Sequence, residues 1–144
     1  MKKFSFELED LLKIRNFETE QAQIELGKVI SEQNKIKDAL NTLAIEHTNA
    51  KKSVSGLTNF SEIANIHQYY KFLKLQEQNY LEQLAQLEIV IEEKRNIFKE
   101  KLQKSESLKK LKEKHYEAYK ELENKEDEDN ADEIVTAKGN KILG

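Results

Sequence analysis

The amino-acid sequence predicts an all-α protein, a two-helix antiparallel coiled-coil hairpin whose second helix is longer than the first and overhangs it. Three observations lead to this fold class. The 144 residues include no proline and only 4 glycines, so few tight turns are available. Charged residues make up 35% of the chain, against roughly 25% in an ordinary globular domain. Apolar residues recur at heptad spacing on both sides of a single break, which favours two long helices over a sandwich, barrel or Rossmann-type fold.

We expect the first helix to run from about residue 5 to about residue 55. Apolar residues recur there with alternating steps of four and three residues, and this seam continues without interruption to Leu57. A sustained seam of this kind keeps one stripe of a helix against a partner helix. Its positions are Leu8, Leu12, Arg15, Thr19, Ala22, Leu26, Val29, Gln33, Ile36, Leu40, Leu43, His47, Ala50, Val54 and Leu57.

The interior of the chain has one cluster of turn-forming residues, at residues 53–62. Gly56 suits the left-handed position that often ends a helix, because glycine has no Cβ to clash there. Asn59 suits an N-cap, and Glu62 follows three residues later as the partner of a capping box. We therefore predict a turn over about residues 56–59.

The second helix is expected over about residues 59–138, stopping at Gly139, with a short tail over residues 139–144. On this prediction residues 1–144 form a single coiled-coil domain. The second helix carries its own seam, most of whose members are apolar. Its positions are Ile63, Ile66, Tyr70, Leu73, Glu77, Tyr80, Leu84, Leu87, Ile91, Lys94 and Phe98.

The two seams match when the chain folds back on itself at the turn. Leu26 then lies opposite Ile91, and the other seam positions pair in the same antiparallel register as far as Thr19 and Phe98. Beyond these the seam weakens, because Arg15 would face Lys101 and Leu12 would face Ser105. Residues 109–138 have no partner in this register, which predicts an overhang that is either frayed or held by another protein.

Polar residues interrupt the two seams at Gln33, Glu77 and Lys94. A polar seam position can fix the register of a coiled coil, and a long side chain can reach solvent while its stem packs. Contact with a partner protein is the alternative interpretation. His47 lies on the seam opposite Tyr70, and we interpret it as a histidine of the helix interface.

The sequence offers no set of residues for catalysis or for binding a metal ion or cofactor. The chain has no cysteine, which excludes disulfides, zinc–thiolate sites and thiol catalysis. His47, His67 and His115 are far apart along the helices, and no glycine-rich phosphate loop is present. We therefore predict that the protein is not an enzyme and has no cofactor.

Charge is unevenly distributed along the second helix. Residues 94–114 carry nine Lys or Arg against three Glu, and residues 121–133 carry eight Asp or Glu against one Lys. The two stretches are either solvated faces or a docking surface with two electrostatic zones. The net charge of −3 and the strongly acidic second stretch argue against nucleic acid as a partner. No run of 18 apolar residues and no secretion signal is apparent, so direct membrane insertion is not expected.

Three stretches resemble the family of the flagellar type III export protein FliJ. The start matches best, with Phe4-Ser5-Phe6-Glu7-Leu8 followed by the paired Leu11-Leu12 and then Arg15, Ala22 and Leu26. The aromatic, Leu-rich stretch over residues 69–76 is also similar, as are Asn124-Lys125 and Asp132-Glu133-Ile134-Val135 near the end.

The resemblance implies a fold and a function. Proteins of this family are antiparallel coiled coils that resemble the γ stalk of rotary ATPases. They bind the hexameric flagellar export ATPase and the membrane export-gate protein, and they assist export chaperones. A member of the family would be cytoplasmic and peripherally associated with the export apparatus at the inner membrane.

The resemblance also implies two partner-binding surfaces. The export gate would bind near the turn, and the ATPase ring would bind where the two termini lie, although the first helix here lacks the tyrosines that the family has in its gate-binding surface. The gate-binding candidates are Leu43, His47, Tyr69, Phe72, Leu73, Gln76 and Tyr80. The ATPase-binding candidates are Phe4, Phe6, Leu8, Leu11, Leu12, Leu111, Tyr119 and Leu122.

Other interpretations stay open from the sequence alone. The off-seam aromatics can simply pack across a wide hairpin face, and the apolar residues near the termini can simply close the hairpin. The protein could also be a stalk of a related virulence secretion or rotary ATPase system, or a generic coiled-coil adaptor or chaperone.

Overall fold

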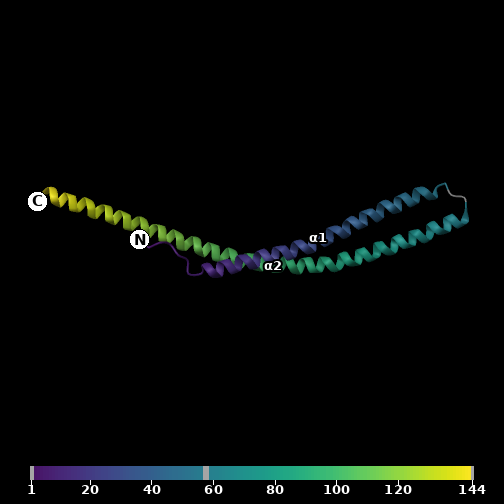
Figure 1. The fold of residues 1–144 in the computed structure, drawn as a ribbon, viewed down its shortest axis with the longest axis horizontal. Helices are drawn as coiled ribbons and strands as arrows, with labels where there is room; N and C mark the ends of the chain where they lie inside the picture. Colours follow the sequence, from purple (N-terminus) through teal and green to yellow (C-terminus); the bar gives the residue numbers. More distant parts are fainter. Residues whose placement is uncertain (1, 57–58, 144) are drawn as a thin grey trace. The chain divides into compact units, whose positions relative to one another are not determined.

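A computed structural model describes residues 2–56 and 59–143, with side chains as far as residue 139. It contains two α-helices, α1 over Glu9–Val54 with 46 residues and α2 over Phe60–Leu143 with 84 residues (Figure 1). No strand is present in the residues that the structure describes. The predicted antiparallel helical hairpin with a longer second helix is confirmed. The seam position Leu57 lies outside the described residues.

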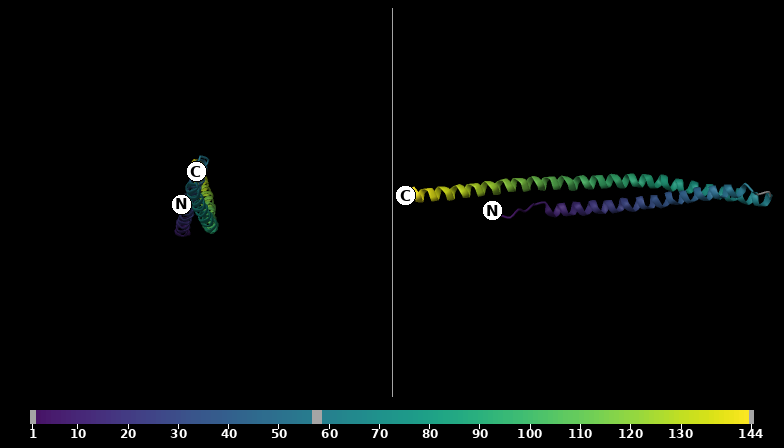
Figure 2. Two further views of the ribbon diagram at one scale, coloured as in Figure 1. Left: turned by 90° about the vertical axis from the view of Figure 1, so that its right-hand side faces the viewer. Right: turned by 90° about the horizontal axis from the view of Figure 1, so that it is seen from above.

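The helices pack in two compact parts. The terminal part comprises residues 1–19 and 100–144, and the turn part comprises residues 20–99. Within each part α1 and α2 lie side by side and run in opposite directions (Figure 2).

The interface of the turn part follows the two predicted seams. Leu73 and Ile91 are its most buried residues, each with 3% of its surface exposed. The other described seam positions in this part are half-buried, except His47 and Glu77, which are exposed. The rings of His47 and Tyr70 lie 5.1 Å apart between centroids, as the predicted register requires. The alternation of apolar residues therefore identified the buried stripe of both helices.

Asn59 caps α2 as predicted. Its side-chain Oδ1 accepts a hydrogen bond from the backbone N–H of Ser61 at 2.9 Å, and its carbonyl accepts the first helical bond from Ile63 at 3.1 Å. The predicted left-handed conformation of Gly56 is wrong, because no described glycine has a positive φ. The last turn of α1 is closed instead by the hydroxyl of Ser55, which donates to the carbonyl of Lys52 at 2.9 Å.

Helix α1 begins at Glu9, later than the predicted start near residue 5. Residues 2–6 are non-helical, and a turn at Glu7–Leu8 leads into α1. We call residues 2–8 the N-terminal arm. Phe4 and Phe6 are separated by one residue, and an extended chain places both rings on one side, whereas a helix would turn them apart. The two rings pack on α2, which explains why the helix does not extend to Ser5.

Helix α2 continues past Gly139 to Leu143, so the predicted stop at Gly139 and the predicted tail are wrong over residues 139–143, while residue 144 lies outside the described residues. A glycine ends a helix when it adopts a left-handed conformation, and Gly139 has no positive φ. Without that conformation glycine only weakens the helix, by about 1 kcal/mol relative to alanine.

The start of α2's unpaired stretch also differs from the prediction. Glu9 bonds Lys112, Phe6 packs on His115, and Phe4 packs on Tyr119, so α2 is covered well beyond residue 109. From residue 120 to residue 139 only Glu123 and Gly139 are half-buried, and the rest are exposed. The N-terminal arm therefore covers a stretch of α2 beyond the one that α1 covers.

Candidate partner-binding surfaces

The turn part contains an open groove between α1 and α2 with a volume of about 810 Å³. Its floor is largely apolar, and polar or charged side chains flank it. A groove of this composition suits the apolar face of a partner helix or an extended peptide. The lining residues are Leu40, Leu43, Ala44, His47, Thr48, His67, Tyr70, Lys71, Leu73, Lys74, Glu77 and Leu81.

Tyr70 lines this groove together with two histidines whose rings lie near its own. Its ring centroid is 5.1 Å from that of His47 on α1 and 6.2 Å from that of His67 on α2. Lys71 and Lys74 follow on the same helix, and Glu77 is the one acidic residue in the lining. The groove therefore combines an aromatic anchor with an excess of cationic groups.

The structure divides the predicted gate-binding residues between two surfaces. Leu43, His47 and Leu73 line the groove, although Leu73 is buried in the helix interface. Tyr69 and Phe72 do not line it, yet they are 40% and 53% exposed and share a face of α2 because they are three residues apart.

The remaining two gate-binding candidates lie at the helix interface. Gln76 and Tyr80 are half-buried, and neither lines the groove. The exposed aromatic pair of Tyr69 and Phe72 and the groove are thus separate candidates for a partner.

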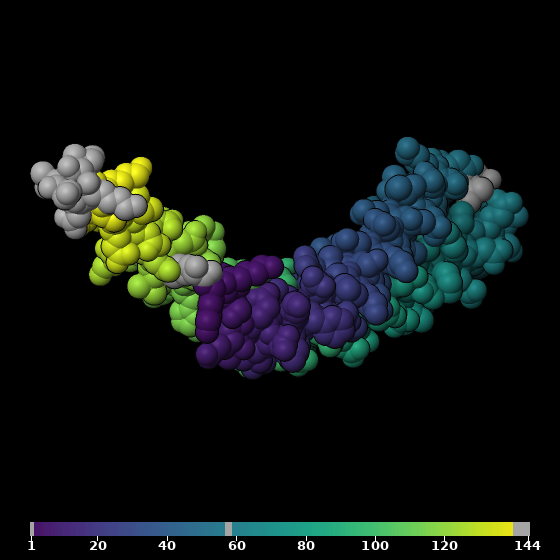
Figure 3. Space-filling view, turned by 60° about the vertical axis from the view of Figure 1, so that its left-hand side comes forward, coloured from purple at the N-terminus to yellow at the C-terminus, as the bar shows by residue number. Residues whose placement is uncertain are grey.

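The terminal part contains an aromatic cluster that fixes the N-terminal arm on α2. The Phe4 ring lies 5.2 Å from Tyr116 and 5.4 Å from Tyr119, and the Phe6 ring meets His115 edge-on at 5.5 Å. Phe6 is only 6% exposed. Figure 3 shows the first residues of the chain, in purple, packed against the green surface of α2.

The predicted ATPase-binding residues differ in how accessible they are. Phe6 and Leu12 are buried, whereas Phe4, Leu11, Leu111 and Tyr119 are half-buried. Leu8 is 37% exposed and Leu122 is 60% exposed, so these two present the most free apolar surface of the set. The arm brings Phe4 and Phe6 to the same stretch of α2 as Tyr119, and the binding of the ATPase ring there stays a prediction.

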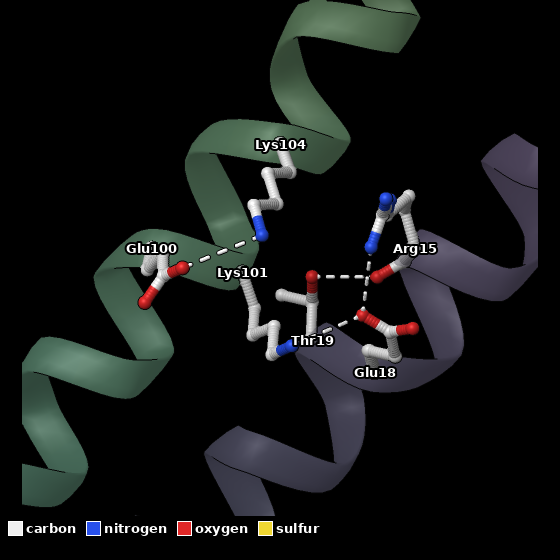
Figure 4. Close-up of polar contacts among 6 residues, drawn as sticks. All are labelled: Arg15, Glu18, Thr19, Glu100, Lys101 and Lys104. Carbon is white, nitrogen blue, oxygen red and sulfur yellow. Dashed lines mark hydrogen bonds and ion pairs between the residues drawn. The ribbon is translucent and has the colours of Figure 1, made fainter.

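A layer of polar residues joins α1 to α2 in the terminal part. The hydroxyl of Ser105 donates a hydrogen bond to Oδ1 of Asn16, and Ser105 is 1% exposed. Next to this pair, Lys101 donates to Glu18 across the interface at 3.3 Å, and Arg15 donates to the same carboxylate oxygen at 3.3 Å (Figure 4). The predicted pairs of Arg15 with Lys101 and of Leu12 with Ser105 are therefore replaced by Glu18 and Asn16.

Two ionisable groups in the terminal part are shifted from their ordinary values. The hydrogen bond from Lys101 lowers the pKa of Glu18, and the positive charges of Lys101 and Arg15 add to this against the opposing effect of burial. Burial raises the pKa of Tyr119, and the neighbouring carboxylate of Glu123 raises it further. Both groups, Glu18 and Tyr119, lie in the stretch where the N-terminal arm and α1 pack on α2.

The acidic stretch at residues 121–133 is a bare helix. Its side chains are exposed except that of Glu123, and within the described residues it takes part in no ion pair. Like charges three or four residues apart weaken an isolated helix by about 0.2–0.5 kcal/mol per pair. This stretch therefore adds charge and accessible surface to the terminal part, and little to its stability.

Several residues that shape these surfaces escaped the sequence analysis. His115, Asn16 and Glu18 contact their partners from positions that the apolar pattern does not mark. The alternation of Phe4 and Phe6 was a usable sign of an extended arm, since period-two spacing is typical of extended chain. Nothing in the heptad pattern signals that Asn16 faces Ser105.

The residues that the structure describes contain no group of three or more His, Asp or Glu arranged to hold a metal ion. None of the helices among them has the length and apolar character needed to cross a bilayer.

Comparison with known proteins gives one match. The model of the family described as "Flagellar FliJ protein" matches residues 4–141. The searches of curated proteins and of solved structures returned no match. The family match covers the N-terminal arm and nearly all of both helices.

Proposed function

This chain belongs to the flagellar FliJ family, and from that membership we propose that it acts in flagellar protein export as a stalk that couples the export ATPase to the export gate. The observation that carries the proposal is that one hairpin presents two unlike surfaces. The turn part has an open apolar groove with cationic flanks, and the terminal part has an aromatic cluster followed by an acidic helix. A protein that binds two different partners needs two such surfaces.

The terminal part is the proposed contact with the ATPase ring. Leu8 and Leu122 offer exposed apolar side chains beside the aromatic cluster. The acidic stretch at residues 121–133 would favour a ring surface rich in Lys and Arg and would speed the encounter by electrostatic attraction.

The turn part is the proposed contact with the export gate. Within it the groove and the exposed pair of Tyr69 and Phe72 are both available. Buried aromatic anchors commonly dominate the binding energy of an interface, and both surfaces provide one. We place the apolar anchor of the gate in the groove, because its floor can remove that anchor from water.

The role is mechanical, with no catalytic step in this chain. The hairpin would favour assembly of the ATPase ring and link it to the gate, and it would assist export chaperones at the same place. This requires a cytoplasmic protein held peripherally at the inner membrane through its partners.

Binding measurements on paired variants test the proposal. Leu8→Ala with Leu122→Ala removes exposed apolar contacts of the terminal part, and it should weaken binding of the ATPase while gate binding is unchanged. Lys71→Glu with Lys74→Glu reverses the charge at the groove, and it should weaken binding of the gate alone. Tyr69→Ala with Phe72→Ala shows whether the second surface of the turn part contributes.

A matched control is Ile24→Ala with Ile45→Ala, which removes apolar side chains that are 50% and 62% exposed and do not line the groove. This control should bind both partners normally. Loss of both partners in every variant that circular dichroism shows to be helical would contradict two separate surfaces and favour a generic adaptor.

A further inference from the structure

We infer that the half-buried Asn16 and the buried Ser105 form a register lock, a polar pair which holds α1 and α2 of the terminal part in a single alignment. Ser105 is 1% exposed and its hydroxyl is bonded to the Asn16 side chain across the interface. Thr19, one turn further along α1, is 9% exposed and bonds the carbonyl of Arg15 within its own helix at 2.8 Å. The interface at this level is therefore polar although it is buried.

A polar layer in a coiled coil sacrifices stability and gains specificity. Two leucines in this layer would bury more apolar surface than a serine and an asparagine. Only one alignment pairs the Ser105 hydroxyl with the Asn16 side chain. After a slip by one turn, Leu12 or Glu20 would lie opposite Ser105. The Ser105 hydroxyl could then donate to a carbonyl of its own helix, as Thr19 does, so the cost of the slip is the lost hydrogen bond of the Asn16 amide.

Neighbouring ion pairs reinforce the same alignment. Glu18 bonds Lys101 at 3.3 Å, and Glu9 bonds Lys112 at 2.8 Å, and both pairs join α1 to α2. In the turn part, the ion pairs among the described residues join Lys28 to Glu25 and Arg95 to Glu92, each within one helix. Polar contacts that discriminate between registers are thus concentrated in the terminal part.

The lock lies at a polar level of the interface, one turn of α1 from Leu12, which is 5% exposed. Thr19 and Lys101 are the neighbouring interface residues, and they offer fewer apolar contacts than leucines would to prefer one register. Many turns of α1 separate Asn16 from the hairpin turn, so small local changes in helical winding can accumulate before this point. A single buried polar residue is sufficient to specify register in coiled coils.

Cysteine cross-linking tests the lock directly, since the chain has no native cysteine. Glu9→Cys with Lys112→Cys reports the observed register. Lys13→Cys with Lys112→Cys reports a slip by one turn, because Lys13 follows Glu9 by one turn of α1. With the lock intact, the slipped pair should form at least about fivefold more slowly than the native pair, since the loss of one intramolecular hydrogen bond shifts such an equilibrium by about that factor.

The lock is removed by Asn16→Leu with Ser105→Leu. In this background the rate of the slipped pair relative to the native pair should rise by about fivefold, because the lost hydrogen bond no longer favours the native register, while the pair of Glu18 and Lys101 still does. Asn16→Ala with Ser105→Ala adds no volume and gives the same comparison if the leucines are not accommodated. Gln33→Leu is the control, since it replaces a polar seam residue of the turn part and should leave the slipped pair slow.

The inference is overturned if the variant without the lock is helical and still forms only the native cross-link. It is equally overturned if its new cross-links join two molecules, since the pair would then set the oligomeric state and not the register.

Discussion

Glu18 accepts hydrogen bonds from two cations at once, Arg15 on its own helix and Lys101 on α2. A carboxylate in this position links the first turns of α1 to the facing stretch of α2. Its pKa is lowered chiefly by the bond from Lys101, so the folded protein holds the charged form more strongly than the unfolded chain does.

Glu18→Gln should therefore lower the melting temperature at neutral pH. Because the folded-state pKa of Glu18 lies below its ordinary value, its contribution is complete above the unfolded-state pKa and is lost as pH falls through the folded-state pKa. Melting curves of the two proteins between neutral pH and strongly acidic pH should converge as the carboxylate is protonated. Glu25→Gln is the control, since Glu25 pairs only with Lys28 on its own helix. An equal difference at both ends of the pH range would contradict a role for the Glu18 charge.

The helices and the N-terminal arm differ in how they are held. Helix α2 starts at the side-chain cap of Asn59, whereas α1 starts directly after the N-terminal arm, which packs on α2. The backbone N–H of Glu9 donates to Phe6, and that of Leu12 donates to Leu8, so the arm and the first turn of α1 are joined by hydrogen bonds. The start of α1 therefore depends on the packing of the arm.

Phe6→Ala should loosen the end of the arm next to α1 without unfolding the hairpin. The ring is 6% exposed and is the aromatic contact of the arm nearest to Glu9, so its loss frees this end while Phe4 still packs on Tyr116 and Tyr119. Hydrogen exchange at the amides of Glu9 and Leu12 should become faster, while amides in the turn part keep their protection. Ser5→Ala changes an exposed neighbour in the same arm and should leave these rates unaltered. Unchanged exchange at both amides in the Phe6 variant would show that the arm does not support the start of α1.

Asn59→Ala should destabilise the protein by about 1 kcal/mol, because it removes the side-chain oxygen that caps the N–H of Ser61. For a chain of this size that corresponds to a fall of roughly 2–4 °C in melting temperature. Asn65→Ala, at an exposed position inside α2, is the matched control. It should be neutral or slightly stabilising, since alanine is the better helix former. Equal effects of the two substitutions would contradict a capping role for Asn59.

At the scale of the whole molecule, the sequence was sufficient for the hairpin and insufficient for its polar details. Heptad spacing specifies which stripe of each helix is buried, and Leu73 and Ile91 lie where it places them. The heptad pattern does not predict contacts made by polar side chains, so the sequence did not identify Asn16 and Glu18 as interface residues. The pattern also assigned both Glu77 and Gln33 to the seam as polar positions. In the structure Glu77 is exposed in the groove, whereas Gln33 is half-buried.

The candidate surfaces were predictable to a similar degree. The seam pattern marks Tyr69 and Phe72 as aromatic residues off the seam, and both are exposed in the structure, while their binding of a partner stays a prediction. The groove was not predicted from the sequence, because its position depends on which side of the helix pair leaves Leu40, Ala44 and Leu81 uncovered. A seam pattern describes the interface and says little about its flanks.

The central claim is that a single chain connects the export ATPase to the export gate. The most direct measurement immobilises the cytoplasmic domain of the gate protein, adds this chain, and then adds the ATPase hexamer. The account predicts that the ATPase is retained only when the chain is present, and that either Leu8→Ala with Leu122→Ala or Lys71→Glu with Lys74→Glu reduces the amount of ATPase retained. Release of the chain from the gate when the ATPase is added would show that the two partners compete for one surface, and would contradict the coupling role.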